Sequence, residues 1–367
     1  MVQVVKAKTA GKKELSSEYI FLSYFNPKRK KLAEENVPRH LDIELLDRCT
    51  GGCKFCWNYS TPSGQKVLPR ERLFNLIDEA AQLGTVSIEW QGGEPLFYPW
   101  LFEASEYAAE KGIECCVFTS GIPLTKQMCK KIVKWGGLQY VGLNIETTNE
   151  RVFARIHDHP KTLKKKLDNW KSLLDAGFPS SRVFVSTTLT KPVAEAIEET
   201  IDYFVDEMKV AHVFLFPYKP QGPTSLTHLE REWEPSLDEV RRAMEYRAKR
   251  LSPEWLRIAT LDTPHIHCIY KCYINIDGEV APCNWLTHMS AGNIHEKSFI
   301  DIHEPNKEML HFKTIKIKGK CADCEHNDVC FGCRGNAWRY LGDVEASDPK
   351  CWKNPESPQY VWQMDMK

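Results

Sequence analysis

The chain has 367 residues, and its 49 Lys plus Arg balance its 49 Asp plus Glu, which gives a net formal charge of zero. This balance disfavours a nucleic-acid-binding protein or a protein that docks on anionic membranes. No apolar run approaches the ~20 residues that span a bilayer, and no apolar export signal follows Met1. We therefore expect a cytoplasmic protein of about two domains, with neither nucleic acid nor membrane as a partner. The basic runs at 28–31 and 164–166 are interpreted as solvated faces.

The first chemical motif follows an expected strand at 41–46. Cys49, Cys53 and Cys56 stand there at the spacing C-x3-C-x2-C. Three thiolates at this spacing bind three corners of a [4Fe-4S] cluster and leave the fourth iron without a protein ligand. A structural zinc site normally has a fourth ligand, and the nearest histidine along the chain, His40, is nine residues upstream. Since disulfides are rare in the cytosol, a chain with 14 cysteines favours metal binding or catalysis.

A second motif, Gly92, Gly93, Glu94 and Pro95, follows the expected strand at 86–90. Together with the cysteine loop, it resembles the radical S-adenosylmethionine (SAM) superfamily, whose GGEP motif binds the amino end of SAM. The resemblance implies that SAM chelates the open iron through its amino and carboxylate groups. One electron then releases a 5′-deoxyadenosyl radical, which takes a hydrogen atom from the substrate. A low-potential donor such as flavodoxin or ferredoxin is the implied electron source.

Strand-like and helix-like segments alternate from residue 38 to residue 220, which predicts an α/β fold with a parallel sheet. The resemblance implies a partial (β/α)6 radical SAM barrel over 38–220, with its site on loops at the C-terminal ends of the strands. The expected strands are 41–46, 86–90, 114–119, 140–145, 182–189 and 212–216. The expected helices are 69–83, 99–111, 125–135, 163–176 and 195–208.

The resemblance also implies further contacts to SAM. Ser120 ends the third strand, where the family often has Asn. Asn144 and Glu146 end the fourth, where family side chains meet the carboxylate end and the ribose of SAM. Arg155 stands near the place of a family arginine that pairs with the SAM carboxylate, and a surface helix residue is the alternative. Trp57 is expected either to contact the cluster and adenine or to pack in the core.

Other side chains at strand ends are candidates for substrate contact or acid/base catalysis, although each type is more often structural: Glu44, Glu89, Thr188, Thr190, Tyr218 and Lys219. The adjacent Cys115 and Cys116 lie mid-strand, so only one of them faces the barrel interior. A small buried hydrophobe is the favoured interpretation of this pair, and a hydrogen-atom donor is the alternative. Cys129, on an expected helix, is interpreted as structural.

The remaining boundaries follow from composition. Residues 1–37 are expected to be a polar extension with an apolar patch at 19–25, and 221–262 a linker followed by a helix at 237–250. Residues 263–353 are expected to form a small cysteine-rich domain and 354–367 a C-terminal tail. Inside the cysteine-rich domain, 275–280 predicts a hairpin whose Asp-Gly turn favours type I′ geometry.

The cysteines of this second domain resemble those of the SPASM domain, although the last pair before Cys351 is separated by two residues rather than three. The resemblance implies two auxiliary [4Fe-4S] clusters. The nearer cluster would be held by Cys268, Cys272, Cys283 and Cys333, and the farther one by Cys321, Cys324, Cys330 and Cys351. A pair of zinc sites is the alternative, but beside the first motif we favour iron–sulfur clusters.

These features predict a radical SAM oxidoreductase of the SPASM type, whose auxiliary clusters accept electrons from the substrate. We expect it to oxidise or cross-link a peptide or protein, as sulfatase-maturating enzymes and peptide cross-linkers do. The alternative is a small-molecule oxidoreductase, epimerase or cofactor-biosynthesis enzyme. A rival from another class is a non-enzymatic zinc or electron-transfer protein, which predicts bound zinc or clusters that do not react with SAM.

Overall fold

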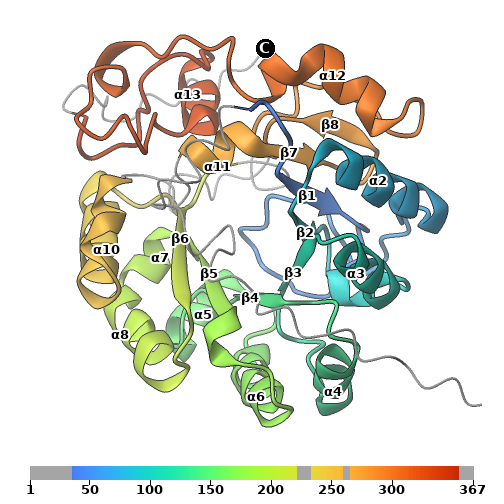
Figure 1. Cartoon of the computed structure of the whole chain (residues 1–367). Coiled ribbons are helices and arrows are strands. Elements are labelled where there is room, and N and C mark those ends of the chain that lie inside the picture. Colours follow the sequence, from blue (N-terminus) through green and yellow to red (C-terminus); the bar gives the residue numbers. More distant parts are fainter. Residues whose placement is uncertain (1–34, 221–232, 259–264, 355–367) are drawn as a thin grey trace, which may run out of the picture.

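The structure is a computed structural model that describes residues 35–220, 233–258 and 265–354. The apolar patch at 19–25, the basic run at 28–31, most of the predicted linker and the tail after 354 therefore lie outside the described residues. A nine-stranded sheet runs through the molecule in the order β6-β5-β4-β3-β2-β1-β7-β8-β9. Helices lie around the outside of this sheet (Figure 1).

The first six strands are all parallel, and their neighbours follow chain order, as the alternation predicted. Since β6 and β9 are the two edges of the sheet, the barrel is partial rather than closed. The strand ends differ from the predicted ones by no more than two residues. The strands are β1 (His40–Glu44), β2 (Ser87–Gln91), β3 (Glu114–Thr119), β4 (Tyr140–Asn144), β5 (Val183–Leu189) and β6 (His212–Pro217).

The predicted crossover helices are present, but α5 (Glu150–Ile156) and α7 (Lys191–Ala194) are additional short helices and the last predicted helix is interrupted. The single helix expected at 195–208 is divided into α8 (Ile197–Asp202) and a π-helical turn, Tyr203–Glu207. The other helices of the barrel are α2 (Arg70–Leu83), α3 (Leu101–Glu110), α4 (Lys126–Trp135) and α6 (Thr162–Asp175). The later helices are α10 (Leu237–Arg250), α11 (His265–Tyr270), α12 (Phe299–Leu310) and α13 (Arg334–Leu341).

Strand residues alternate between the helix-facing side of the sheet and the barrel interior. In β1, Leu41 and Ile43 belong to the main hydrophobic core, whereas His40, Asp42 and Glu44 form the buried polar face. The opposite wall of the interior is aromatic, with Tyr140, Phe184 and Phe214 in one cluster. Cys116 lies in that aromatic cluster and Cys115 in the main core, so one cysteine of the pair faces inward, as predicted. Its neighbours favour a packing role for Cys116.

The cysteine-rich part continues the same sheet. Strand β7 (Lys271–Ile274) pairs in parallel with β1, with Cys272 opposite Leu41. Strands β8 (Glu279–Ala281) and β9 (Gly292–Asn293) then add in antiparallel fashion, which confirms the predicted hairpin. The predicted type I′ turn is wrong, because type I′ requires positive φ at both central residues. The amide of Gly278 donates to Asn275 O at 3.0 Å, and φ is +86° at Gly278 but is not positive at Asp277.

Candidate functional site

The loop with the first three cysteines leaves the C-terminal end of β1 and rests on the end of α5. Cys53 forms a backbone bridge with His157, and Lys54 N donates to Ile156 O at 3.1 Å. On the other side, Cys49 N donates to Thr61 O at 2.9 Å. These backbone hydrogen bonds hold the cysteine loop at the C-terminal ends of the strands, where α/β barrels carry their sites.

The thiols of this loop lie close together, and none is in a disulfide. A Cβ at Gly51 would lie 3.3 Å from Cys49 Sγ and 3.7 Å from Cys53 Sγ. Burial raises the pKa of Cys56 to about 11, and the neighbouring thiol of Cys49 adds to this effect. Burial likewise raises the pKa of Cys53. Thiols in such a place lose their protons readily only to a bound metal centre, so the donor set fits an iron–sulfur cluster.

The loop formed by Gly92, Gly93, Glu94 and Pro95 lies directly against the cysteine loop. Gly93 N donates to Leu46 O at 2.7 Å, and Glu94 N donates to Arg48 O at 2.9 Å. A Cβ at Gly93 would lie 2.2 Å from Arg48 O, so no other residue fits at this position. The two motifs are therefore in contact at the ends of β1 and β2.

The Glu94 side chain joins the end of β2 to the end of β3. Its carboxylate accepts hydrogen bonds from Thr119 Oγ1 at 2.7 Å and from Ser120 Oγ at 2.6 Å and N at 2.9 Å. Burial raises the pKa of Glu94, and the hydrogen bonds from Ser120 and Thr119 oppose that rise. Ser120 therefore lies beside the Gly92–Pro95 loop, although its hydroxyl donates to Glu94.

Beyond the end of β4, a buried acid lies beside a buried cation. Lys166 Nζ donates to Asn144 O at 2.9 Å and lies 3.8 Å from Glu146 Oε2. Burial raises the pKa of Glu146, and Lys166 opposes the rise. In the described part of the chain, Glu146 Oε2 has no hydrogen-bond donor. The expected contact residues Asn144 and Glu146 are thus brought together by Lys166.

The interpretation of 164–166 as a solvated face is wrong for Lys166. Its side chain is fully buried, whereas Lys164 is exposed and pairs with Asp168. Its positive charge lies near the cysteine loop, because Lys166 is the main charge that opposes the raised pKa of Cys53. Sequence reasoning missed this residue, which belongs to the site.

Arg155 lies in the last turn of α5 and forms a surface ion pair. Its Nη1 lies 2.8 Å from both carboxylate oxygens of Glu195, and its side chain is 47% exposed. This is the arrangement expected of a surface helix residue. A contact between Arg155 and SAM remains a proposal, and it requires Arg155 to leave Glu195.

His157 is a second residue that sequence reasoning missed. It lies opposite Cys53 in the backbone bridge, although it is far from the cysteine motif along the chain. Its ring stacks on Phe153, and its Nδ1 accepts a hydrogen bond from His159 N at 3.0 Å. Burial lowers the pKa of His157 to about 3, so the ring is neutral. Only the pairing of the loop with the end of α5 reveals this proximity.

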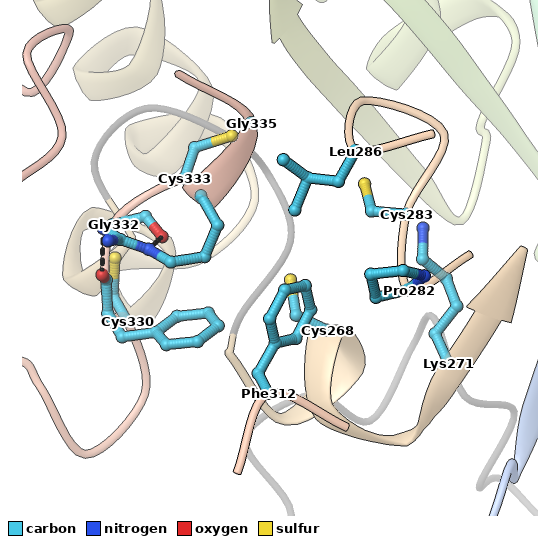
Figure 2. A pocket seen from close by; sticks show the side chains of 12 residues that line it. Cys268, Lys271, Pro282, Cys283, Leu286, Phe312, Cys330, Gly332, Cys333 and Gly335 are labelled. Atoms are coloured by element: carbon cyan, nitrogen blue, oxygen red, sulfur yellow. Dashed lines mark hydrogen bonds between the residues drawn. The ribbon is translucent and has the colours of Figure 1, made fainter. Parts of the chain in front are cut away.

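Four cysteines of the second block line one pocket (Figure 2). They are Cys268, Cys283, Cys330 and Cys333, and Lys271 lies at the same pocket. Burial raises the pKa of Cys268, and the thiols of Cys283 and Cys333 add to that rise. Three of the four pocket cysteines were expected for the nearer auxiliary cluster, and the fourth, Cys330, was expected for the farther one.

Cys272, the fourth member expected for that cluster, does not lie at the pocket. It is fully buried and belongs to the main hydrophobic core with Leu41 and Ile43. Successive strand residues point to opposite faces, and in β7 it is Lys271 that faces the pocket. We therefore correct the ligand assignment of Cys272, which the structure places in the core.

Three of the cysteines expected for the farther cluster, Cys321, Cys330 and Cys351, lie near Asp348. Burial, Asp348, Cys330 and Cys321 all raise the pKa of Cys351. Asp348 N donates to Cys321 Sγ at 3.3 Å, and Asp348 Oδ2 accepts from Cys333 N at 2.8 Å. Cys330 thus lies between the two groups of thiols. Cys324 Sγ accepts a hydrogen bond from His326 N at 3.5 Å.

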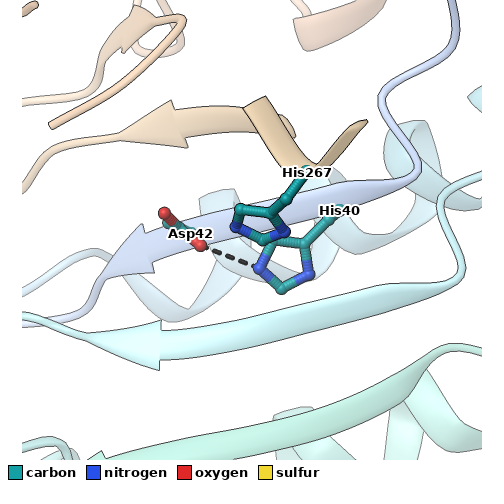
Figure 3. A group of neighbouring side chains, drawn as sticks. All are labelled: His40, Asp42 and His267. Atoms are coloured by element: carbon teal, nitrogen blue, oxygen red, sulfur yellow. Dashed lines mark hydrogen bonds and ion pairs between the residues drawn. The ribbon is translucent and has the colours of Figure 1, made fainter. Parts of the chain in front are cut away.

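A separate polar cluster fills the barrel interior below the site. His40, Asp42 and His267 lie with their ligand atoms within 4.8 Å of one another, and all three are buried (Figure 3). Lys271 Nζ lies 2.7 Å from Asp42 Oδ2, and His40 bonds to Ser87 Oγ at 2.7 Å. Since a lysine ammonium already neutralises Asp42, we interpret the cluster as an internal ion-pair network. His267 is buried and belongs to this network.

Two tryptophans connect the cysteine loop to the auxiliary pocket. Trp57, next to Cys56, lies 6.1 Å from Trp285 between ring centroids. Trp285 N in turn donates a long hydrogen bond of 3.5 Å to Cys283 Sγ. Trp57 therefore packs between the two cysteine regions.

Comparison with known proteins agrees with this site. The radical SAM superfamily model matches residues 43–204, and the SPASM model, an iron–sulfur cluster-binding domain, matches residues 268–334. This chain belongs to the radical SAM superfamily. As a member with a SPASM domain, it uses a SAM-binding [4Fe-4S] cluster and auxiliary iron–sulfur clusters. The rival interpretation as a zinc protein is thereby disfavoured.

The similar proteins include enzymes with different products. The AdoMet-dependent heme synthase of Methanosarcina barkeri is 28% identical over 88% of this chain and 99% of its own length. The PqqA peptide cyclase of Bradyrhizobium diazoefficiens is 24% identical over 89% of this chain and 90% of its own. Streptococcus suis SuiB bound to its precursor peptide SuiA has the same fold, with a TM-score of 0.64, 18% identity and coverage of 89% and 79%. Within the described residues, no helix is long and apolar enough to cross a membrane.

Proposed function

We propose that this protein is a SPASM-type radical SAM oxidoreductase in which Cys49, Cys53 and Cys56 hold the SAM-binding cluster. The observation that carries the proposal is the contact between the cysteine loop and the Gly92–Pro95 loop at one edge of the sheet. When bound, the cluster supplies the electron that splits SAM and produces the radical that takes a hydrogen atom from the substrate. The proposed radical SAM barrel spans 38–220, and the proposed SPASM domain spans 263–353.

The chain's own groups would hold SAM from several sides. Glu146 would accept hydrogen bonds at its unpartnered carboxylate oxygen, and Lys166 would keep that carboxylate ionised. The loop from Gly92 to Pro95 would offer backbone groups, while Glu94 holds the loop in place through Ser120. Asn144, Trp57 and Arg155 complete the proposed contacts.

The auxiliary clusters are proposed to accept electrons from the substrate. Cys268, Cys283 and Cys333 would hold the nearer cluster, and the farther set is Cys321, Cys324, Cys330 and Cys351. The Trp57–Trp285 contact supports the assignment of Cys283 to the nearer cluster, because it joins the cysteine loop to Cys283. A low-potential donor such as flavodoxin or ferredoxin is the proposed reductant.

Two substrate classes have support. Peptide or protein modification is supported by the similarity to PqqA peptide cyclase and by the fold shared with SuiB. Small-molecule cofactor biosynthesis is supported by the similarity to heme synthase, which has the higher identity and covers nearly the whole of that relative. The cofactor-biosynthesis alternative therefore gains weight over the expectation from sequence.

The test begins with protein purified and reconstituted without oxygen. Three cubane clusters predict about twelve irons per chain, and addition of SAM and a reductant should then release 5′-deoxyadenosine. Cys53→Ala serves as the control and should release none. Bound zinc in place of iron, or equal product from wild type and Cys53→Ala, would contradict the proposed function.

A further inference from the structure

Lys219 is a buried cation at the mouth of the barrel. It lies two residues beyond β6, on the same edge of the sheet as the cysteine loop. The residue is only 4% exposed. Among the residues that the structure describes, its Nζ has no hydrogen-bond acceptor. A buried ammonium is costly unless an anion or several acceptors surround it.

The Lys219 ammonium lies between the two proposed cluster regions. Its Nζ is 4.3 Å from the centroid of the Trp285 ring. That same ring contacts Trp57, next to the cysteine loop, and its backbone N contacts Cys283 Sγ at the auxiliary pocket. The proposed function places the substrate between the two cluster regions, and Lys219 lies beside the Trp57–Trp285 contact that joins them.

The nearby acid does not serve as the partner of Lys219. Glu234 Oε1 lies 2.5 Å from Lys350 Nζ and accepts a hydrogen bond from Tyr340 OH at 2.6 Å. Lys350 and Glu234 therefore compensate each other's charge. Lys219, in contrast, has no acid as a hydrogen-bond partner among the described residues.

We propose that Lys219 binds a carboxylate of the substrate, and that the substrate is therefore an organic acid. This inference rests on the proposed function, because that function places the substrate between the two cluster regions. A charge-assisted hydrogen bond from the ammonium would hold the acid, while the faces of Trp57 and Trp285 contact its apolar part. The carboxylate has two possible sources: an acidic side chain of a peptide, or a carboxylated small molecule.

The experiment compares acids with their neutral counterparts in anaerobic equilibrium binding to the reconstituted protein. One pair is a short peptide with a central glutamate and the same peptide with glutamine. The other pair is haem, which carries two propionates, and its dimethyl ester. We expect wild type to bind at least one acid about tenfold more tightly than its neutral form, which corresponds to one charge-assisted hydrogen bond. A preference within the peptide pair identifies an acidic peptide as the source, and a preference within the haem pair identifies a small molecule.

Three variants test whether Lys219 causes the preference. Lys219→Met should abolish it, and Lys219→Arg should retain most of it. Lys164→Met, which removes the same charge from an exposed position, should leave it unchanged. The proposal is overturned if wild type prefers neither acid, or if Lys219→Met keeps the preference. It is also overturned if Lys219→Met weakens SAM binding, because the anion would then be the SAM carboxylate. SAM cleavage by wild type is measured separately, and its absence refutes the proposed function rather than the carboxylate preference.

Discussion

Cys272 provides the sharpest test of the auxiliary-cluster assignment. Cys272 is fully buried on the core face of β7, so Cys272→Ala should remove a small apolar contact and no iron. Losing one buried atom of about methyl size costs about 1 kcal/mol of unfolding free energy. The reconstituted variant should retain the wild-type content of about twelve irons per chain. Cys268→Ala, which changes a pocket-lining thiol, should lose about four of them.

The assay is iron and acid-labile sulfide per chain after anaerobic reconstitution and desalting, with Mössbauer spectra to count cubane clusters. Denaturant unfolding of both variants separates a loss of fold from a loss of ligand. The number of cysteines favours Cys272 as a ligand. Two cubane clusters with one thiolate per iron need eight cysteines, and the cysteine-rich domain has eight. If Cys272→Ala lost about four irons and Cys268→Ala did not, the strand-face argument would be refuted.

Three further predictions concern the SAM site and the C-terminal region. Lys166→Met should lower the free energy of unfolding by about 3–5 kcal/mol, because it leaves Glu146 buried without its cation. Lys164→Met, at an exposed position, should change this free energy by less than about 0.5 kcal/mol. Similar values for the two variants in denaturant unfolding would contradict the prediction. Glu146→Gln should weaken SAM binding about tenfold in equilibrium dialysis, since a charged acceptor becomes neutral, and an unchanged affinity would remove Glu146 from the contacts. Burial lowers the pKa of His311 to about 4. The folding free energy that His311 contributes above its unfolded pKa of about 6.5 should therefore be lost as pH falls toward 4. His311→Gln should flatten the plot of unfolding free energy against pH in this range, and an equally steep plot would exclude His311 as the source.

The sequence predicts the barrel well because its signals are local. Strands alternate with amphipathic helices, and the two glycine- and cysteine-containing loops follow the first two strands directly. The sequence also contains a signal that Lys166 is buried, although the basic residues beside it suggest an exposed position. Lys166 stands three residues after Leu163 and four before Trp170, both of which are buried on the same face of α6. Helical periodicity therefore predicts that Lys166 is buried, while charge alone predicts that it is exposed.

The errors concern contacts that depend on pairing between distant segments. The face of β7 on which Cys272 lies is decided by the pairing of β7 with β1, which the cysteine spacing does not reveal. His157 reaches the cysteine loop only through the bridge to Cys53. The hairpin turn is a local exception, because Asp277 and Gly278 are not its two central residues and Gly278 closes the turn instead.

Strand β1 fixes the separation between the proposed catalytic cluster and the proposed auxiliary cluster. It pairs with β2 on one side and with β7 on the other, so both cysteine regions are attached to a single strand. Glu44, at the end of β1, accepts a hydrogen bond from Asn58 Nδ2 at 2.7 Å and another from Ile276 N at 3.0 Å. Asn58 follows the cysteine loop and Ile276 belongs to the hairpin turn, so one buried carboxylate ties the two loops together. The rate of electron transfer depends on distance, and the pairing of β1 with β2 and β7 sets the positions of both loops.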